Sequence, residues 1–227
     1  MRVLAVVVVA LAFVVVGSAY LFYGPPSQGR PGGQQKPIIL YVNQGNGVVN
    51  GSGFGTMLNF TSAHGFNTVF FQVYRQGRLL FSSSTLQSFV SQAHRAGLKI
   101  FFALYITNAS QSLPSSVFGL HEDGVSLDMS TLPLGAQQSF LAALKSEFNG
   151  ETAVTTTDMY SPLKPDLLVL ETYGNSYQQY IRTGIVAGVG VFATSSESDY
   201  QSQFQYALQK SDGVMVFDYY GLQKAGY

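Results

Sequence analysis

The sequence contains no cysteine, and charged residues make up only 11% of its 227 residues. Without cysteine the chain forms neither disulfide bonds nor thiolate metal sites, although an extracellular location stays open. Its 12 basic and 12 acidic side chains cancel, so nothing indicates nucleic-acid binding. Hydrophobic residues are abundant at 46%, which suffices for one globular domain with a sizeable core.

The N-terminal segment, residues 1–23, joins Arg2 to an apolar run that contains the small residues Gly17 and Ala19. These small residues fit signal-peptide cleavage after Ala19. The segment is also long enough to span a bilayer, which takes about 20 residues, and Arg2 would orient the rest outward. A buried core helix is the third alternative, but such helices are rarely apolar on every face. We therefore expect an exported protein, either secreted or anchored in the membrane by this segment.

Residues 24–37 are rich in Pro, Gly and Gln, the composition of a linker that cannot bury enough surface to fold. The folded domain is therefore expected over residues 38–227. Within it, one unit occurs twice: a helix end, a glycine cap at Gly65 or Gly97, and an apolar strand. His64 and His94 fall in the last helical turns, where an imidazole interacts with free carbonyl groups, so we expect structural roles for both.

Eight apolar runs are predicted as strands: 38–43, 68–74, 98–105, 124–129, 152–157, 167–172, 185–192 and 213–218. Helices are predicted between them at 53–63, 85–96, 136–148, 177–182 and 198–210. Strands that alternate with helices pair in parallel, and eight repeats predict an α/β fold, a compact (β/α)8 TIM barrel. Residues 157–166 are too few for a normal helix, so we expect one helix to be missing.

The predicted C-terminal strand ends collect aromatic rings, carboxylates and amides. In a parallel barrel these ends meet at one face, where the chemistry of the fold is placed. Such side chains suit the binding of sugar rings by stacking and hydrogen bonding. The residues predicted to bind substrate are Tyr41, Gln72, Tyr74, Tyr105, Asp158, Tyr173 and Tyr219, with Arg75 also at a strand end.

Three acids are candidates for catalysis, because glycoside hydrolysis uses one carboxylic acid and one carboxylate. Glu171 ends an apolar run, so poor solvation should raise its pKa, as a general acid requires. Asp128 has Ser126 and Ser130 nearby as hydrogen-bond donors that keep it ionised, which suits a nucleophile. Asp218 either orients the substrate or replaces one of this pair. Each acid could instead cap a helix or bind a loop.

Other reaction classes on this fold lack their residues. None of the predicted C-terminal strand ends carries a lysine, which a Schiff-base aldolase needs. The three histidines, His64, His94 and His121, are scattered over helix ends and a loop, so no metal site is predicted. Gly221 alone is weak evidence for a phosphate site. We expect no cofactor, a monomer, and a polysaccharide or other glycan as the partner.

Four stretches carry a family resemblance: 65–73, 93–99, 123–128 and 212–222. Together they resemble the glycosyl-hydrolase-like glycosidase barrels, a group related to the family 18 chitinases and the endo-alpha-1,4-polygalactosaminidases. The similarity is a pattern of strand sequences that covers nearly all of residues 38–227. It implies a (β/α)8 barrel that acts on a polysaccharide. By similarity to the polygalactosaminidases, Asp128 would be the nucleophile and Glu171 the acid.

The sequence departs from the chitinase signature Asp-x-x-Asp-x-Asp-x-Glu, whose positions hold Asp123, Ser126, Asp128 and Ser130 here. Because Ser130 replaces the catalytic Glu, substrate-assisted chitinase chemistry is not expected. Two functions stay open: an exported or membrane-tethered glycoside hydrolase that uses an Asp/Glu pair, and a non-catalytic carbohydrate-binding or cell-envelope protein on a degenerate barrel.

Overall fold

The computed structural model describes residues 35–44, 49, 51–173, 179–190 and 197–227. The segment 1–23 and nearly all of the predicted linker lie outside these residues. Among the residues described, no helix has the length and apolar character needed to cross a membrane.

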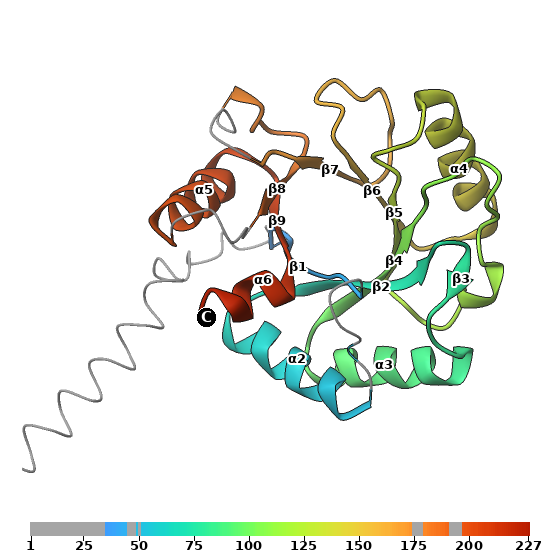
Figure 1. The fold of residues 1–227 in the computed structure, drawn as a ribbon, viewed down its shortest axis with the longest axis horizontal. Coiled ribbons are helices and arrows are strands. Elements are labelled where there is room, and N and C mark those ends of the chain that lie inside the picture. Colours follow the sequence, from blue (N-terminus) through green and yellow to red (C-terminus); the bar gives the residue numbers. More distant parts are fainter. Residues whose placement is uncertain (1–34, 45–48, 50, 174–178, 191–196) are drawn as a thin grey trace, which may run out of the picture.

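Eight parallel strands close into a barrel, seen end-on in Figure 1. They are β1 (Ile38–Val42), β2 (Thr68–Arg75), β4 (Lys99–Tyr105), β5 (Gly124–Asp128), β6 (Glu151–Thr156), β7 (Leu167–Glu171), β8 (Val186–Gly190) and β9 (Gly213–Phe217). Strand β1 pairs with both β2 and β9, and this double pairing closes the ring. A two-residue strand, β3 (Arg78–Leu79), extends β2 as an antiparallel hairpin.

Five α-helices lie outside the ring in the described chain (Figure 1). They are α2 (Gly51–Ala63), α3 (Ser83–Arg95), α4 (Leu134–Glu147), α5 (Glu197–Lys210) and α6 (Tyr219–Lys224), and a short 3-10 helix, η1, spans Ser115–Val117. The chain between β6 and β7 contains no helix, as its length predicted. The fold is therefore a TIM-barrel-like α/β fold with fewer helices, which confirms the prediction.

The predicted helix and strand ends differ from the structure in a few places. Strand boundaries agree to within one or two residues, and helices α2, α3 and α4 begin two residues earlier than expected. The predicted helix 177–182 is not borne out at 179–182, where no α-helix forms, and the rest of that range lies outside the described residues. Helix α6 was not predicted, because it directly follows a strand and is only six residues long.

Both predicted glycine caps and both structural histidines occur. Gly65 and Gly97 have φ angles of 70° and 72°, a conformation that glycine adopts at little cost after a helix. The His64 ring hydrogen-bonds the carbonyl oxygen of Phe60, four residues earlier, at 2.8 Å. The His94 ring instead reaches Asp123 at 2.9 Å, which ties α3 to the start of β5.

The core has two layers because the strands are buried on both faces. Alternate residues point outward and pack against the helices. The others fill the barrel: Ile39, Tyr41, Phe70, Phe101, Ala103, Ala153, Val169, Val186 and Met215. Burial of about 25 cal/mol per Å2 of apolar surface favours this arrangement. Because these side chains fill its centre, the barrel is a packed core with hollows at its two ends, and it is not a pore.

Candidate active site at the carboxyl ends of the strands

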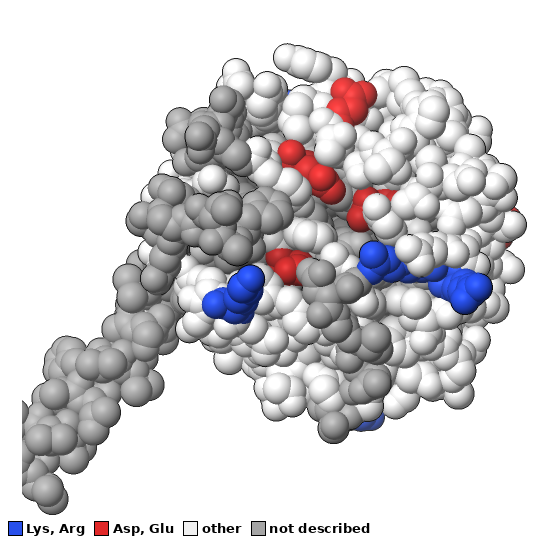
Figure 2. All heavy atoms as spheres, viewed as in Figure 1, with Lys and Arg blue, Asp and Glu red and all other residues white. Residues whose placement is uncertain are grey.

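A cavity of about 240 Å3 opens at the end of the barrel where the strands finish. We call it the mouth pocket, lined by Tyr41, Asn43, Gln72, Arg75, Tyr105, Asp128, Ser130, Glu171, Tyr173 and Phe217. More than three quarters of the chain separates its first and last residues in sequence, so only the closed barrel brings them together. Acidic atoms gather around a hollow at the barrel centre in Figure 2, with basic atoms beside them on an otherwise uncharged surface.

Asp128 is the last residue of β5 and points into the mouth pocket. Strands β4 and β6 flank it, with Tyr105 and Thr155 in register. Its Oδ2 accepts a hydrogen bond from the Tyr41 hydroxyl at 3.3 Å, whereas its buried Oδ1 makes no hydrogen bond within the described chain. Burial, and then the negative charge of Glu171, raise the pKa of Asp128 to about 7, although Tyr41 and the Ser130 backbone oppose the rise.

Glu171 ends β7, two strands away from Asp128 around the barrel, and lines the same pocket. Burial raises the pKa of Glu171 above its usual value, in the direction expected from the apolar run that precedes it. Neither carboxyl group belongs to either of the ion pairs among the described residues, His94 with Asp123 and Lys99 with Glu151.

The two carboxyl groups of the mouth pocket interact through their charges. Because two negative charges in one poorly solvated pocket repel each other, the charge of Glu171 disfavours ionisation of Asp128. Asp128 keeps its proton up to about neutral pH, while Glu171 is the member whose negative charge is felt by its partner. A protonated Asp128 is the opposite of the ionised state expected from sequence, whereas the raised pKa of Glu171 was expected. The Ser130 backbone does lower the pKa of Asp128, but burial outweighs it, and the Ser126 hydroxyl has no hydrogen-bond partner in the described chain.

A chain of polar groups supports Asp128 from the other side of the barrel. The backbone N–H of Gln44 donates to Gln72 Oε1 at 3.0 Å, and the Gln72 side chain also hydrogen-bonds Tyr41. Tyr41 in turn donates to Asp128. Burial and the charge of Asp128 raise the pKa of the Tyr41 phenol well above its usual value, so Tyr41 stays a hydrogen-bond donor. The sequence-predicted residues Tyr41, Gln72 and Asp128 thus form one network.

A β-bulge in β2 decides which of two neighbouring residues enters the pocket. The register with β4 shifts between Gln72 and Tyr74, so Gln72 lies opposite Ala103 but Arg75 lies opposite Tyr105. Strict alternation would have turned Tyr74 inward and Arg75 outward. Instead, Tyr74 packs in the outer core and donates to the Ser112 carbonyl at 3.1 Å, and Arg75 lines the mouth pocket.

Three aromatic rings form one side of the mouth pocket. The rings of Tyr41 and Phe217 lie 5.1 Å apart, and those of Tyr173 and Phe217 lie 6.3 Å apart. Tyr105 lines the pocket from β4 and is half-buried. Such rings offer apolar faces beside polar groups, the combination typical of a small-molecule site.

Besides Tyr74, three predicted site residues lie outside the mouth pocket. Asp218 caps α6 by accepting the Gly221 N–H at 2.9 Å, and it does not line the mouth pocket, although its charge helps raise the pKa of Tyr173. Tyr219 is buried against Phe60, with ring centres 5.2 Å apart. Asp158 is exposed in the loop after β6, where it accepts the Tyr160 N–H at 3.0 Å.

Sequence reasoning did not name Asn43, Ser130 and Phe217 as pocket residues. Phe217 could have been found, because it continues the inward-facing series Gly213, Met215 and Phe217 on the last strand. Asn43 and Ser130 follow their strands, where alternation no longer fixes the side-chain direction. No group of three or more potential metal ligands occurs within the described ranges.

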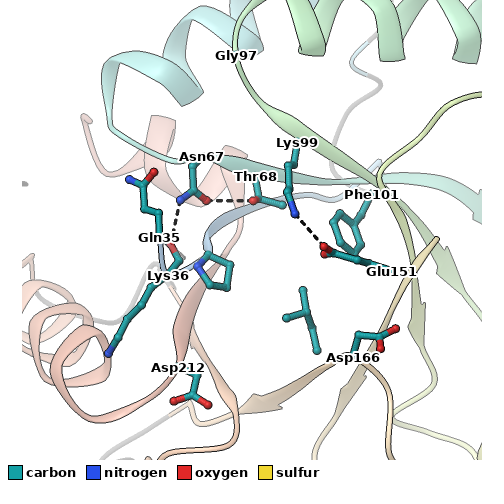
Figure 3. A pocket seen from close by; sticks show the side chains of 12 residues that line it. Gln35, Lys36, Asn67, Thr68, Gly97, Lys99, Phe101, Glu151, Asp166 and Asp212 are labelled. Atoms are coloured by element: carbon teal, nitrogen blue, oxygen red, sulfur yellow. Dashed lines mark hydrogen bonds and ion pairs between the residues drawn. The ribbon is translucent and has the colours of Figure 1, made fainter. Parts of the chain in front are cut away.

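A larger hollow of about 780 Å3 lies at the opposite, N-terminal end of the barrel and is shown in Figure 3. Its polar groups are engaged in structural contacts. Lys99 pairs with Glu151 at 2.9 Å, the Asn67 amide donates to the Lys36 carbonyl at 2.9 Å, and Asp166 accepts both the N–H and the hydroxyl of Thr152. This face of a TIM barrel serves stability, so the smaller mouth pocket is the better candidate.

Comparisons with known proteins place the fold but assign no family. No family model matches the sequence, and no curated protein matches it. A β-mannanase structure from Streptomyces thermolilacinus has 12% identity and a TM-score of 0.57, over 83% of this chain and 81% of that one. A Pseudomonas stutzeri endoglucanase structure has 9% identity and a TM-score of 0.55, over 80% of this chain and 84% of that one. A tryptophan synthase structure from M. tuberculosis has 13% identity and a TM-score of 0.51, over 80% of this chain and 83% of that one.

At these identities the likenesses show the fold alone. The chain is a TIM-barrel protein with distant structural resemblance to glycoside hydrolases and also to other TIM-barrel enzymes. Its function has to be argued from the mouth pocket.

Proposed function

We propose that this protein hydrolyses glycosidic bonds of a polysaccharide in the mouth pocket, with Asp128 and Glu171 as its two carboxyl groups. One observation carries the proposal: the buried Asp128 and the half-buried Glu171 share one pocket, neither forms an ion pair with a described residue, and Asp128 has a pKa of about 7. Glycoside hydrolysis needs such a pair, one protonated and one ionised. The β-mannanase and the endoglucanase, both polysaccharide hydrolases by name, show that the fold suits this chemistry.

The pKa order assigns the roles. Asp128, protonated near neutral pH, donates its proton to the glycosidic oxygen as the bond to the anomeric carbon breaks. Glu171, ionised, faces the positive charge that develops at that carbon and acts as nucleophile or as base toward water. The half-buried rings of Phe217 and Tyr173 provide apolar surface for the sugar beside this pair, with Tyr41 buried beneath Phe217. Nothing in this scheme requires a metal or cofactor.

The proposal includes an exported protein that residues 1–23 anchor in the membrane or direct to secretion. Residues 35–37 line the N-terminal hollow and lead into β1. Any segment before them therefore joins the domain on the face opposite the mouth pocket. A tether on that side would leave the pocket open to a large external substrate.

The test measures release of reducing ends from a panel of neutral and amino-sugar polysaccharides by the full chain purified in detergent. We expect Asp128→Asn and Glu171→Gln each to lower the rate about 100-fold to 10,000-fold, the usual contribution of acid–base catalysis. Glu147→Gln is the matched control, because Glu147 is exposed at the end of α4.

Two results would count against hydrolysis. Activity that survives in both pocket variants would remove Asp128 and Glu171 from the mechanism. Binding of glycans without cleavage by the unaltered protein would favour the alternative, a carbohydrate-binding barrel. The second result would leave the mouth pocket as the binding site but without its chemistry.

A further inference from the structure

The hairpin that follows β2 places two arginines side by side. Gln76 and Gly77 form its two-residue loop, with φ angles of 52° and 76°, the positive values that a tight type I′ turn requires. The loop pairs Arg75 directly with Arg78 across the two strands. Side chains of directly paired residues lie on the same face of a hairpin, so both arginine side chains leave it on one face, within reach of a common ligand.

This pairing is unfavourable in isolation. Like charges directly opposite each other destabilise a β-hairpin. Neither guanidinium makes a hydrogen bond or an ion pair with any described residue, since both ion pairs there involve other groups. The two charges are therefore uncompensated in a chain whose net charge is zero.

The bulge in β2 directs one of the two arginines at the candidate chemistry. It sets Arg75 in register with Tyr105, and Tyr105 in register with Asp128, so the three residues form one row across β2, β4 and β5. Adjacent strands lie about 4.8 Å apart, which puts the Cα atoms of Arg75 and Asp128 about 10 Å from each other. Arg75 lines the mouth pocket with Asp128, and Arg78 is exposed beside it.

The position of Arg75 argues against a role at the reacting carbon. Arg75 forms no ion pair with Asp128 or Glu171, because both ion pairs of the described chain involve other residues. A positive charge would also disfavour the oxocarbenium-like transition state of glycoside hydrolysis. Arg75 is therefore placed to contact another part of the substrate than the bond that breaks.

We propose that Arg75 and Arg78 form an anion subsite, which binds a carboxylate or sulfate group on a sugar adjoining the one held by Asp128 and Glu171. An arginine fork matches such oxyanions with two parallel hydrogen bonds, and an anion placed between the two guanidinium groups removes their repulsion. The proposal rests on the proposed glycosidase function and names its substrate class: an acidic polysaccharide, such as a uronic-acid or sulfated glycan.

The test compares the dissociation constants of three probes by calorimetry, with the full-length Asp128→Asn protein in detergent to prevent turnover. The probes are an oligogalacturonate, its neutral methyl ester and a sulfated neutral oligosaccharide. We expect one or both anionic probes to bind about 10-fold to 100-fold more tightly than the methyl ester, the usual range for charged hydrogen bonds. Preference for the oligogalacturonate indicates a carboxylate ligand, and preference for the sulfated probe indicates a sulfate ligand.

Added variants assign the preference to the hairpin. Arg75→Gln should abolish it, Arg78→Gln should weaken it, and Arg75→Lys should keep part of it because the charge remains without the fork. Arg95→Gln, an equal change of charge in the last turn of α3, should leave it unchanged. Circular dichroism of each variant confirms folding before binding is compared.

Equal binding of the three probes, or an unchanged preference in Arg75→Gln, would overturn the subsite. Its failure is distinguishable from failure of the glycosidase proposal. Cleavage of an acidic polysaccharide with the same KM and rate by the unaltered protein and by Arg75→Gln would keep the hydrolase and remove the subsite. A preference for anions that depends on Arg75, in a protein that cleaves nothing, would keep the subsite and remove the hydrolase.

Discussion

The Tyr41 hydroxyl donates a hydrogen bond to Oδ2 of Asp128 at 3.3 Å, although 87 residues separate them in sequence. Because Oδ2 accepts this bond, a proton on the carboxyl group belongs on Oδ1, the oxygen without a partner. The contact therefore does more than fill the barrel. It selects which oxygen of Asp128 carries the proton.

The pH dependence of the activity should follow from the two carboxyl groups of the mouth pocket. Asp128 has to hold its proton, so kcat/KM should fall as the pH rises through about 7, the pKa that burial and Glu171 give it. Glu171 has to be ionised, so the rate should also fall on the acid side, at a pH above the usual glutamate value of 4.5 because burial raises its pKa. A pH–rate profile checks both limbs, and a rate still rising above pH 8 would contradict the assignment of Asp128 as the acid.

Removal of the Asp128 carboxyl group should change how stability depends on pH. The raised pKa of Asp128 means that the folded protein holds a proton that the unfolded chain releases, so this contribution to stability is complete below pH 3.8 and is lost as the pH rises to about 7. At 1.36 kcal/mol per pKa unit the loss is about 4 kcal/mol, as an order of magnitude. Urea unfolding should therefore show that Asp128→Asn gains stability relative to the unaltered protein between pH 4 and pH 8. Parallel pH curves for the two proteins would refute this.

Loss of the Tyr41 hydroxyl should raise the pKa of Asp128 further, because its hydrogen bond favours the ionised carboxylate. In Tyr41→Phe the alkaline limb of the pH–rate profile should move upward. Stability should fall by about 1 kcal/mol, the usual net value of one hydrogen bond. Carbon-13 NMR titration of labelled aspartate measures the pKa directly. Tyr74→Phe is the matched control, because its hydroxyl bonds a backbone carbonyl outside the mouth pocket, and it should leave the limb in place.

Substitution of Gly188 should disturb the strand that carries Glu171. A Cβ atom at position 188 would lie 2.9 Å from the Leu170 carbonyl oxygen and 3.3 Å from the Glu171 Cα, so the β7 backbone would have to move. We expect Gly188→Ala to destabilise the fold by about 1–3 kcal/mol, as overpacking does, and to lower activity. Thermal unfolding measures the first effect.

The control for Gly188 is Gly135 in the first turn of α4, where an added Cβ meets nothing within 4 Å. Gly135→Ala should be neutral or should stabilise the protein by up to about 1 kcal/mol, because alanine favours helix. A Gly188→Ala protein as stable as Gly135→Ala would show that β7 yields more easily than its packing indicates.

Much of the barrel was predictable because strand patterns are local. Runs of apolar residues between glycine caps mark the eight strands, and alternation along each strand turns Tyr41, Gln72, Asp128 and Glu171 to the inside. The same alternation explains why these four strand-end residues share the mouth pocket. The limits of the helices and the absence of one between β6 and β7 also follow from local sequence and length.

Other features depended on contacts between distant segments. The β2 bulge turns Arg75 toward the mouth pocket in the place where alternation would have put Tyr74. Only the register with β4 reveals this bulge. Asp218 caps an unforeseen helix, which removes it from the pocket it was predicted to share. Single-strand periodicity contains neither effect, because each depends on how a neighbouring element packs.

The sequence by itself determined the strands, their inward faces and the presence of acids at the strand ends, since these follow from local periodicity. Only the tertiary structure decided which acids meet and which of them keeps its proton. A pKa depends on burial and on the charge of a second group, and both are supplied by chain far away in sequence. Asp128 and Glu171, 43 positions apart by their numbers, both acquire raised pKa values in that way.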